Sequence, residues 1–112
     1  MLNRSAITVT AKKPFLEWLR QLPDPIDESR TLDQINEDSS IFLLPEYDSE
    51  SEIEECLKGC FEFVFDEQLN SWWTDETAWP ENRDFSMFKE WFNVSFHSMV
   101  QDIVDEPLID DD

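Results

Sequence analysis

The sequence predicts an α+β domain in which a small sheet of two or three strands packs on one long amphipathic helix, accompanied by two shorter helices. The long helix follows from residues 49–73, where apolar side chains recur at steps of three and four. The sheet follows from an alternating, β-branched stretch at 6–10 and a short apolar run at 40–44. A chain of 112 residues with 40% hydrophobic content suits one folded domain, which we expect to occupy residues 1–104.

The chain before the long helix predicts a strand, a short helix, a helical turn and a second strand. Pro14 suits the first turn of the short helix, and Pro23 ends it. Thr31 can cap a single turn over residues 32–35. The apolar run at 40–44 is typical of a strand buried on both faces. Parallel pairing with the first strand would make the connection a right-handed crossover.

The long helix at 49–73 has a well-marked start and a wide apolar face. Ser49 can cap the first turn, and Glu52 can reach back to the nitrogen of the cap residue. Phe63 and Leu69 widen the apolar arc, so we expect this helix to contact both the sheet and a second helix. The main apolar stripe comprises Ile53, Cys56, Leu57, Cys60, Phe61, Val64, Phe65 and Trp72.

Two polar residues interrupt that apolar face near its C-terminal end. Gln68 projects near the centre of the face, and Glu67 lies on its flank. Gln68 either hydrogen-bonds to a backbone group near the end of the helix or lines a pocket that opens there.

The remainder of the chain predicts a loop, a third helix and a third strand. Residues 72–83 form a loop rich in tryptophan and acidic residues, after which Asp84 can cap a helix with an aromatic side. Residues 95–104 fit both helical spacing and alternation, and we favour a strand because a two-stranded sheet alone is marginal. Residues 105–112 are strongly acidic, and we expect a frayed C-terminal tail.

The net charge of −19 is unevenly distributed along the chain. Residues 1–20 hold four basic residues and one acid, whereas residues 24–55 hold twelve acids and a single basic residue, Arg30. Such a field attracts basic proteins and cations and repels nucleic-acid phosphates and anionic membranes. We therefore predict a basic protein as the partner, with no direct binding to nucleic acid or membrane.

The sequence lacks the residues required for a glycine-rich nucleotide-binding loop and for a membrane-spanning helix. One glycine is too few for a glycine-rich phosphate loop. No apolar run approaches the roughly 20 residues that a membrane helix needs. The N-terminal segment lacks the apolar core and cleavage site of a signal peptide, so we expect a cytoplasmic location.

No arrangement of residues amounts to a catalytic signature, and we predict no catalytic residue, metal site or cofactor. His97, the single histidine, has no serine or cysteine partner at a diagnostic spacing and is expected to be structural. Cys56 and Cys60 lie one helical turn apart and are expected to pack as small hydrophobes. Glu62 and Asp66 could hold a hydrated divalent cation, although their place opposite the apolar arc favours a solvated face.

An acidic row near and along the long helix permits a further interpretation, mimicry of nucleic acid. Carboxylates at the spacing of backbone phosphates can occupy the basic groove of a DNA-binding protein. A merely soluble acidic surface explains the same residues. The row comprises Asp48, Glu50, Glu52, Glu54, Glu55, Glu62 and Asp66.

The tryptophan-rich loop and the adjoining end of the long helix form the predicted binding site. Aromatic faces beside carboxylates suit lysine and arginine side chains, and tryptophan is enriched at interaction hot spots. The rival interpretation is that the tryptophans close the end of the core. The predicted site comprises Glu67, Gln68, Trp72, Trp73, Asp75, Glu76 and Trp79.

Three segments, which together with the residues between them span residues 31–108, carry a resemblance: TLDQINEDSSIFLLPEY, WWTDETAWPENRDFSMFKEWF and FHSMVQDIVDEPL. They resemble a group of short acidic bacterial proteins of no known activity. The resemblance implies a bacterial cytoplasmic setting and brings no ligand or catalytic residue.

The sequence thus favours a non-enzymatic acidic protein that binds a basic protein surface. The alternatives are a carboxylate-dependent enzyme, with or without a metal, and a nucleic-acid mimic. The broad apolar arc can be covered within the chain or by a second copy, so the oligomeric state stays open.

Overall fold

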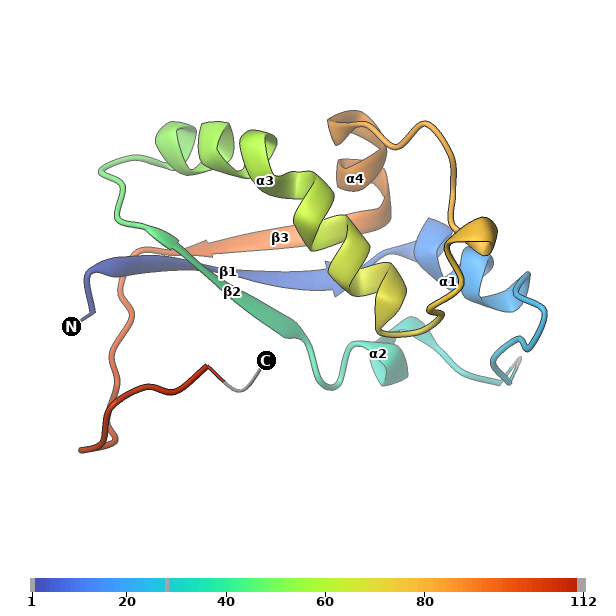
Figure 1. The fold of residues 1–112 in the computed structure, drawn as a ribbon, viewed down its shortest axis with the longest axis horizontal. Helices are drawn as coiled ribbons and strands as arrows, with labels where there is room; N and C mark the ends of the chain where they lie inside the picture. Colours follow the sequence, from blue (N-terminus) through green and yellow to red (C-terminus); the bar gives the residue numbers. More distant parts are fainter. Residues whose placement is uncertain (1, 28, 111–112) are drawn as a thin grey trace.

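The computed structural model describes residues 2–27 and 29–110. It shows a three-stranded antiparallel sheet with helices packed over one face, which confirms the predicted α+β class (Figure 1). In chain order the elements are β1 (Arg4–Ala11), α1 (Lys13–Arg20), α2 (Leu32–Ile35), β2 (Ser40–Pro45), α3 (Glu50–Asn70), the 3-10 turn η1 (Glu76–Ala78), α4 (Phe85–Trp91) and β3 (Phe92–His97).

β1 is the central strand of the sheet and pairs antiparallel with a neighbour on each side. Ile7 lies opposite Phe42 of β2 and Phe96 of β3. Because side chains alternate between the two faces of a strand, Ile7 and Val9 share the face that packs on the helices, and both are buried. The opposite face carries no helical layer within the described residues (Figure 1).

The parallel pairing considered for the first two strands is wrong. After α1 and α2 the chain returns to the C-terminal end of β1, so β2 pairs antiparallel with it. The side chain of Asn36, just after α2, pairs with the backbone of Ala11 at that end. The Ala11 N–H donates to Asn36 Oδ1 at 2.8 Å, and Asn36 Nδ2 donates to the Ala11 carbonyl at 3.0 Å. β2 therefore starts beside the C-terminal end of β1 and runs in the opposite direction.

β2 is an edge strand, so the prediction that its apolar run is buried on both faces is also wrong. Leu44 is buried, whereas Ile41 and Leu43 expose 67% and 49% of their surface. A strand is covered on both faces only where a layer of structure packs on each side. The described helices of this chain cover one side.

The third strand is present but begins earlier than predicted. α4 runs directly into β3 without a loop, so the strand starts at Phe92. Phe92 and Phe96 alternate onto the packed face of the sheet. The strand predicted at 95–104 ends at His97, and residues 101–110 are irregular and exposed. The boundary between the domain and the acidic tail stays a prediction.

α3 supplies much of the core and contacts both the sheet and α4, as predicted. The ring of Phe65 lies 5.9 Å from that of Phe88 in α4 and 5.4 Å from that of Phe92 in β3, measured between centroids. Leu69 is fully buried, but Phe63 is 61% exposed, so the apolar arc is narrower than predicted. The buried residues of α3 are Ile53, Leu57, Val64, Phe65 and Leu69.

Three helices begin at the side-chain caps that the sequence predicts, namely Thr31, Ser49 and Asp84. Ser49 Oγ accepts the N–H of Glu52 at 3.4 Å. The Glu52 carboxylate accepts a hydrogen bond from the N–H of Asp48 at 3.2 Å. We expected this bond to come from the N–H of Ser49, the next residue. The local signals therefore place these helix starts correctly.

Candidate functional site at the end of α3

The C-terminal end of α3 is closed by hydrogen bonds from the tryptophan-rich loop that follows it. The backbone N–H groups of Trp72 and Trp73 donate to the Leu69 carbonyl at 3.1 and 2.9 Å. Ser71 Oγ donates to the Glu67 carbonyl at 2.7 Å. The helix therefore ends before the two tryptophans that the prediction included in it.

The loop tryptophans also close the end of the core. Trp79 Nε1 donates to the Trp73 carbonyl at 2.7 Å. Trp18 Nε1, from α1, donates to the Ala78 carbonyl at 2.9 Å and ties the loop to that helix. Together with Trp72, the loop tryptophans are half-buried against the hydrophobic core. Core closure is therefore observed, and the binding role of the loop stays a prediction.

Arginines of the chain itself lie over two of these tryptophans. The guanidinium carbon of Arg30 lies 5.9 Å from the ring centroid of Trp72, and that of Arg83 lies 5.5 Å from that of Trp79. Arg83 also forms an ion pair with Asp66, with 2.6 Å between Nη1 and Oδ1. A partner's cation would therefore meet the opposite face or the edge of each ring.

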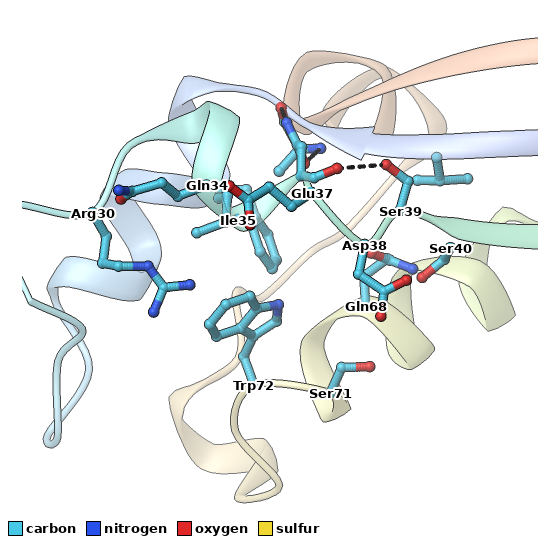
Figure 2. A pocket seen from close by; sticks show the side chains of 14 residues that line it. Arg30, Gln34, Ile35, Glu37, Asp38, Ser39, Ser40, Gln68, Ser71 and Trp72 are labelled. Atoms are coloured by element: carbon cyan, nitrogen blue, oxygen red, sulfur yellow. Dashed lines mark hydrogen bonds between the residues drawn. The ribbon is translucent and has the colours of Figure 1, made fainter.

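A pocket of about 470 Å³ opens between the end of α3, the α2 region and the start of β2 (Figure 2). Two of the predicted site residues, Gln68 and Trp72, line it. Figure 2 shows Arg30 and Trp72 toward one side of the pocket and Asp38, Ser40 and Gln68 toward the other. Its further polar lining residues are Gln34, Asn36, Glu37, Ser39 and Ser71.

The lining of the pocket carries one basic residue, Arg30, and two acidic residues, Glu37 and Asp38. Arg30 is the single basic residue of the acidic stretch 24–55. Glu37 and Asp38 are exposed on the lining, and neither forms an ion pair with a described residue. Carboxylate and amide oxygens accept hydrogen bonds from cationic amino and guanidinium groups, so the part of the pocket where Asp38 lies beside Gln68 suits a cation (Figure 2).

The other predicted site residues lie outside the pocket. Glu67 and Glu76 are exposed. Asp75 starts η1, where its Oδ1 accepts hydrogen bonds from Thr77 Oγ1 at 2.7 Å and from the Thr77 N–H at 3.0 Å, and these bonds lower the pKa of Asp75. Trp73 Nε1 is the buried side-chain polar atom that has no hydrogen-bond partner in the described part of the chain.

Sequence reasoning missed most of the residues that line the pocket. Glu37 and Asp38 reach it because the bonds between Asn36 and Ala11 fix the turn after α2 beside the sheet. Arg30 could have been singled out from the sequence, since it is the single basic residue of the acidic stretch 24–55.

The residues weighed for catalysis or metal binding are not assembled into one site. His97 Nε2 hydrogen-bonds to Thr8 Oγ1 at 3.0 Å on the sheet, outside the pocket. Cys56 and Cys60 are free and half-buried, and burial raises the pKa of the Cys60 thiol, which disfavours the reactive thiolate. Within the described ranges, no group of three or more histidine, cysteine, aspartate or glutamate side chains could hold a metal ion.

Comparisons of the chain with protein-family models, with curated proteins and with solved structures gave no match. Among the described helices, none is both long enough and apolar enough to cross a membrane. What the protein does therefore has to follow from its own residues.

Proposed function

We propose that the protein is a non-enzymatic, acidic protein of the bacterial cytoplasm that binds a basic segment of another protein. The observation that supports this most directly is the excess of exposed carboxylates. Ion pairs between described residues join Asp66 to Arg83 and Glu54 to Lys89, whereas the chain carries 27 acidic residues. A basic partner neutralises part of this excess, and the long-range attraction speeds its encounter with the protein.

The pocket at the end of α3 is the proposed place for one lysine or arginine side chain of the partner. Glu37 and Asp38 supply carboxylates for the cationic head, and the Gln68 side chain supplies an amide oxygen. Trp72 supplies an apolar wall for the methylene stem. Arg30 repels a second cation, so the head of the incoming side chain is directed toward the Asp38 side of the pocket.

Titration with a lysine-rich peptide tests this proposal. The double variant Glu37→Gln/Asp38→Asn is expected to weaken binding about tenfold, which corresponds to ~1.4 kcal/mol. The matched control Asp102→Asn/Asp105→Asn removes the same charge from the exposed segment 101–110 and is expected to weaken binding much less. Tryptophan fluorescence at several salt concentrations gives the dissociation constants.

Two outcomes would contradict the proposal at different levels. Equal losses in the two double variants would mean that the pocket is not the contact and that only the net charge attracts the peptide. If the unaltered protein binds a glutamate-rich peptide of equal length as well as the lysine-rich one at low salt, the basic partner itself is excluded.

The two alternative functions have less support from the described residues. Three acids of the proposed nucleic-acid mimic have partners within the chain: Glu54 with Lys89, Asp66 with Arg83, and Glu52 with the backbone of a neighbour. The enzyme alternative requires convergent acids together with the single histidine, which does not line the pocket. Competition by duplex DNA for a recovered partner would favour the mimic.

A further inference from the structure

β2 has a free outer edge. It pairs with β1 on one side, and no described residue pairs with its other side. Alternate N–H and C=O groups along Ser40–Pro45 therefore point away from the sheet, where they can pair with another extended chain.

The edge of β2 is apolar and uncharged, which is unusual for an unprotected strand. Ile41 and Leu43 expose 67% and 49% of their surface on the open face, opposite Thr8 and Ala6 of β1. Edge strands are ordinarily guarded by lysine, by internal proline or by inward-pointing charge. In β2 the single proline, Pro45, is the last residue of the strand.

Acidic residues flank this uncharged edge at both ends. Glu37 and Asp38 precede β2, and Glu46 and Asp48 follow it, all of them exposed. If two copies of the chain paired antiparallel through β2 about Phe42, Asp38 of one would lie opposite Glu46 of the other. Like charges in such positions are destabilising, and each chain carries a net charge of −19. Lysine or arginine at the same positions would be attracted.

The edge is continuous with the pocket at the end of α3. Asp38, Ser39 and Ser40 line that pocket and also form the approach to β2 and its first residue. Figure 2 shows Asp38 and Ser40 beside Gln68, on the side of the pocket away from Arg30. A chain laid along β2 would therefore end at the mouth of the pocket.

We propose that β2 binds an extended segment of a basic protein as a fourth strand of the sheet. The segment has about six residues with alternating apolar or β-branched side chains, which matches the length of β2. A lysine or arginine lies beyond each end of it, one near Glu46 and the other entering the pocket beside Asp38. That the partner is basic rests on the proposed function. That the partner pairs with β2 rests on the free edge of the strand alone.

The test uses the full chain and a synthetic peptide of alternating valine and threonine with two lysines at each end. Backbone hydrogen exchange is measured with and without peptide. The expected result is slower exchange at alternate residues of β2, because the amides that face β1 are already protected and those on the outer edge are not. A peptide of the same length and charge with proline at alternate positions is expected not to produce this protection.

A pair of matched variants tests whether the edge carries the affinity. Ile41→Lys/Leu43→Lys places two charges beside the edge and is expected to weaken binding at least about tenfold. The control Ile103→Lys/Leu108→Lys makes the same change at exposed residues of the segment 101–110 and is expected to shift the affinity less than about twofold. A second variant, Asp38→Asn/Glu46→Gln, leaves the apolar edge intact and is expected to reduce the salt dependence of binding. Circular dichroism checks that each variant is folded.

The outcomes separate this inference from the proposed function. Binding of the lysine peptide without protection of β2, or equal losses in the two lysine variants, overturns the strand addition and leaves the basic partner standing. Equal binding of a peptide with glutamate ends at β2 overturns the basic partner and leaves the strand addition standing. Absence of binding at low salt overturns both. A dimer in sedimentation velocity, with β2 protected before peptide is added, assigns the edge to a second copy instead.

Discussion

The two faces of the sheet are built from the same strands but differ in burial. On the packed face, Ile7 and Val9 are buried beneath α3 and leave almost no surface to water. On the open face, Thr8 lies between Ile41 of β2 and Ser95 of β3, and Ile41 is largely exposed. One helical layer is thus enough to bury a core. On the open face the small side chain of Ala6 is buried, whereas Ile41 and Leu43 remain exposed.

The largest expected effect comes from removing an aromatic ring on the packed side. Phe65→Ala is expected to lower the free energy of unfolding by about 3–5 kcal/mol, because Phe65 is fully buried and its ring contacts the rings of Phe88, Trp91 and Phe92. Urea denaturation followed by circular dichroism measures the change. A loss below about 1 kcal/mol would mean that the packed face is not the source of stability.

An intermediate effect on the free energy of unfolding is expected for Trp18 and Trp73, which differ in whether the indole N–H has a hydrogen-bond partner. Trp18→Phe is expected to lower the free energy of unfolding by about 1–3 kcal/mol, because the Ala78 carbonyl loses its donor. Trp73→Phe removes a buried Nε1 that has no partner among the described residues, and it is expected to cost less. Equal losses in the same denaturation experiment would show that ring volume, not hydrogen bonding, sets the cost.

The smallest expected effect is on the open face. Ile41→Thr/Leu43→Thr is expected to change the free energy of unfolding by no more than about 0.5 kcal/mol, because both side chains are already exposed and threonine is well suited to strands. Thermal and urea denaturation measure it. Destabilisation approaching that of Phe65→Ala would erase the difference between the two faces and indicate that a layer covers Ile41 and Leu43 in solution.

The sequence predicted the elements whose signals are local. A helix cap acts within three residues of its helix start, so Thr31, Ser49 and Asp84 could be recognised directly. The prediction that β2 is buried on both faces was wrong. An apolar sequence indicates that a strand can pack against an apolar surface, but it does not indicate whether one or both faces are covered. The parallel pairing failed for a similar reason, since the bonds between Asn36 and Ala11 that return the chain depend on the fold.

The candidate site was predictable only where it interrupts a regular pattern. Gln68 drew attention because it is polar within an apolar stripe, and it lines the pocket. Arg30, Glu37 and Asp38 lie in a segment without periodicity, and they reach the pocket through the tertiary path of the chain. The spacing of residues along the chain does not indicate which distant segments come into contact.

The central position of β1 has a consequence for synthesis of the protein on the ribosome. β1 is the first of the three strands to be made, its neighbour β2 follows two helices later, and its other neighbour is made only at Phe92–His97. Until that last strand is available, the nascent chain holds a central strand with an unpaired side, and contacts so distant in sequence form slowly. Folding therefore waits for nearly the whole described chain, and a product that stops before residue 92 would leave β1, the central strand of the complete sheet, as an edge strand with one side unpaired.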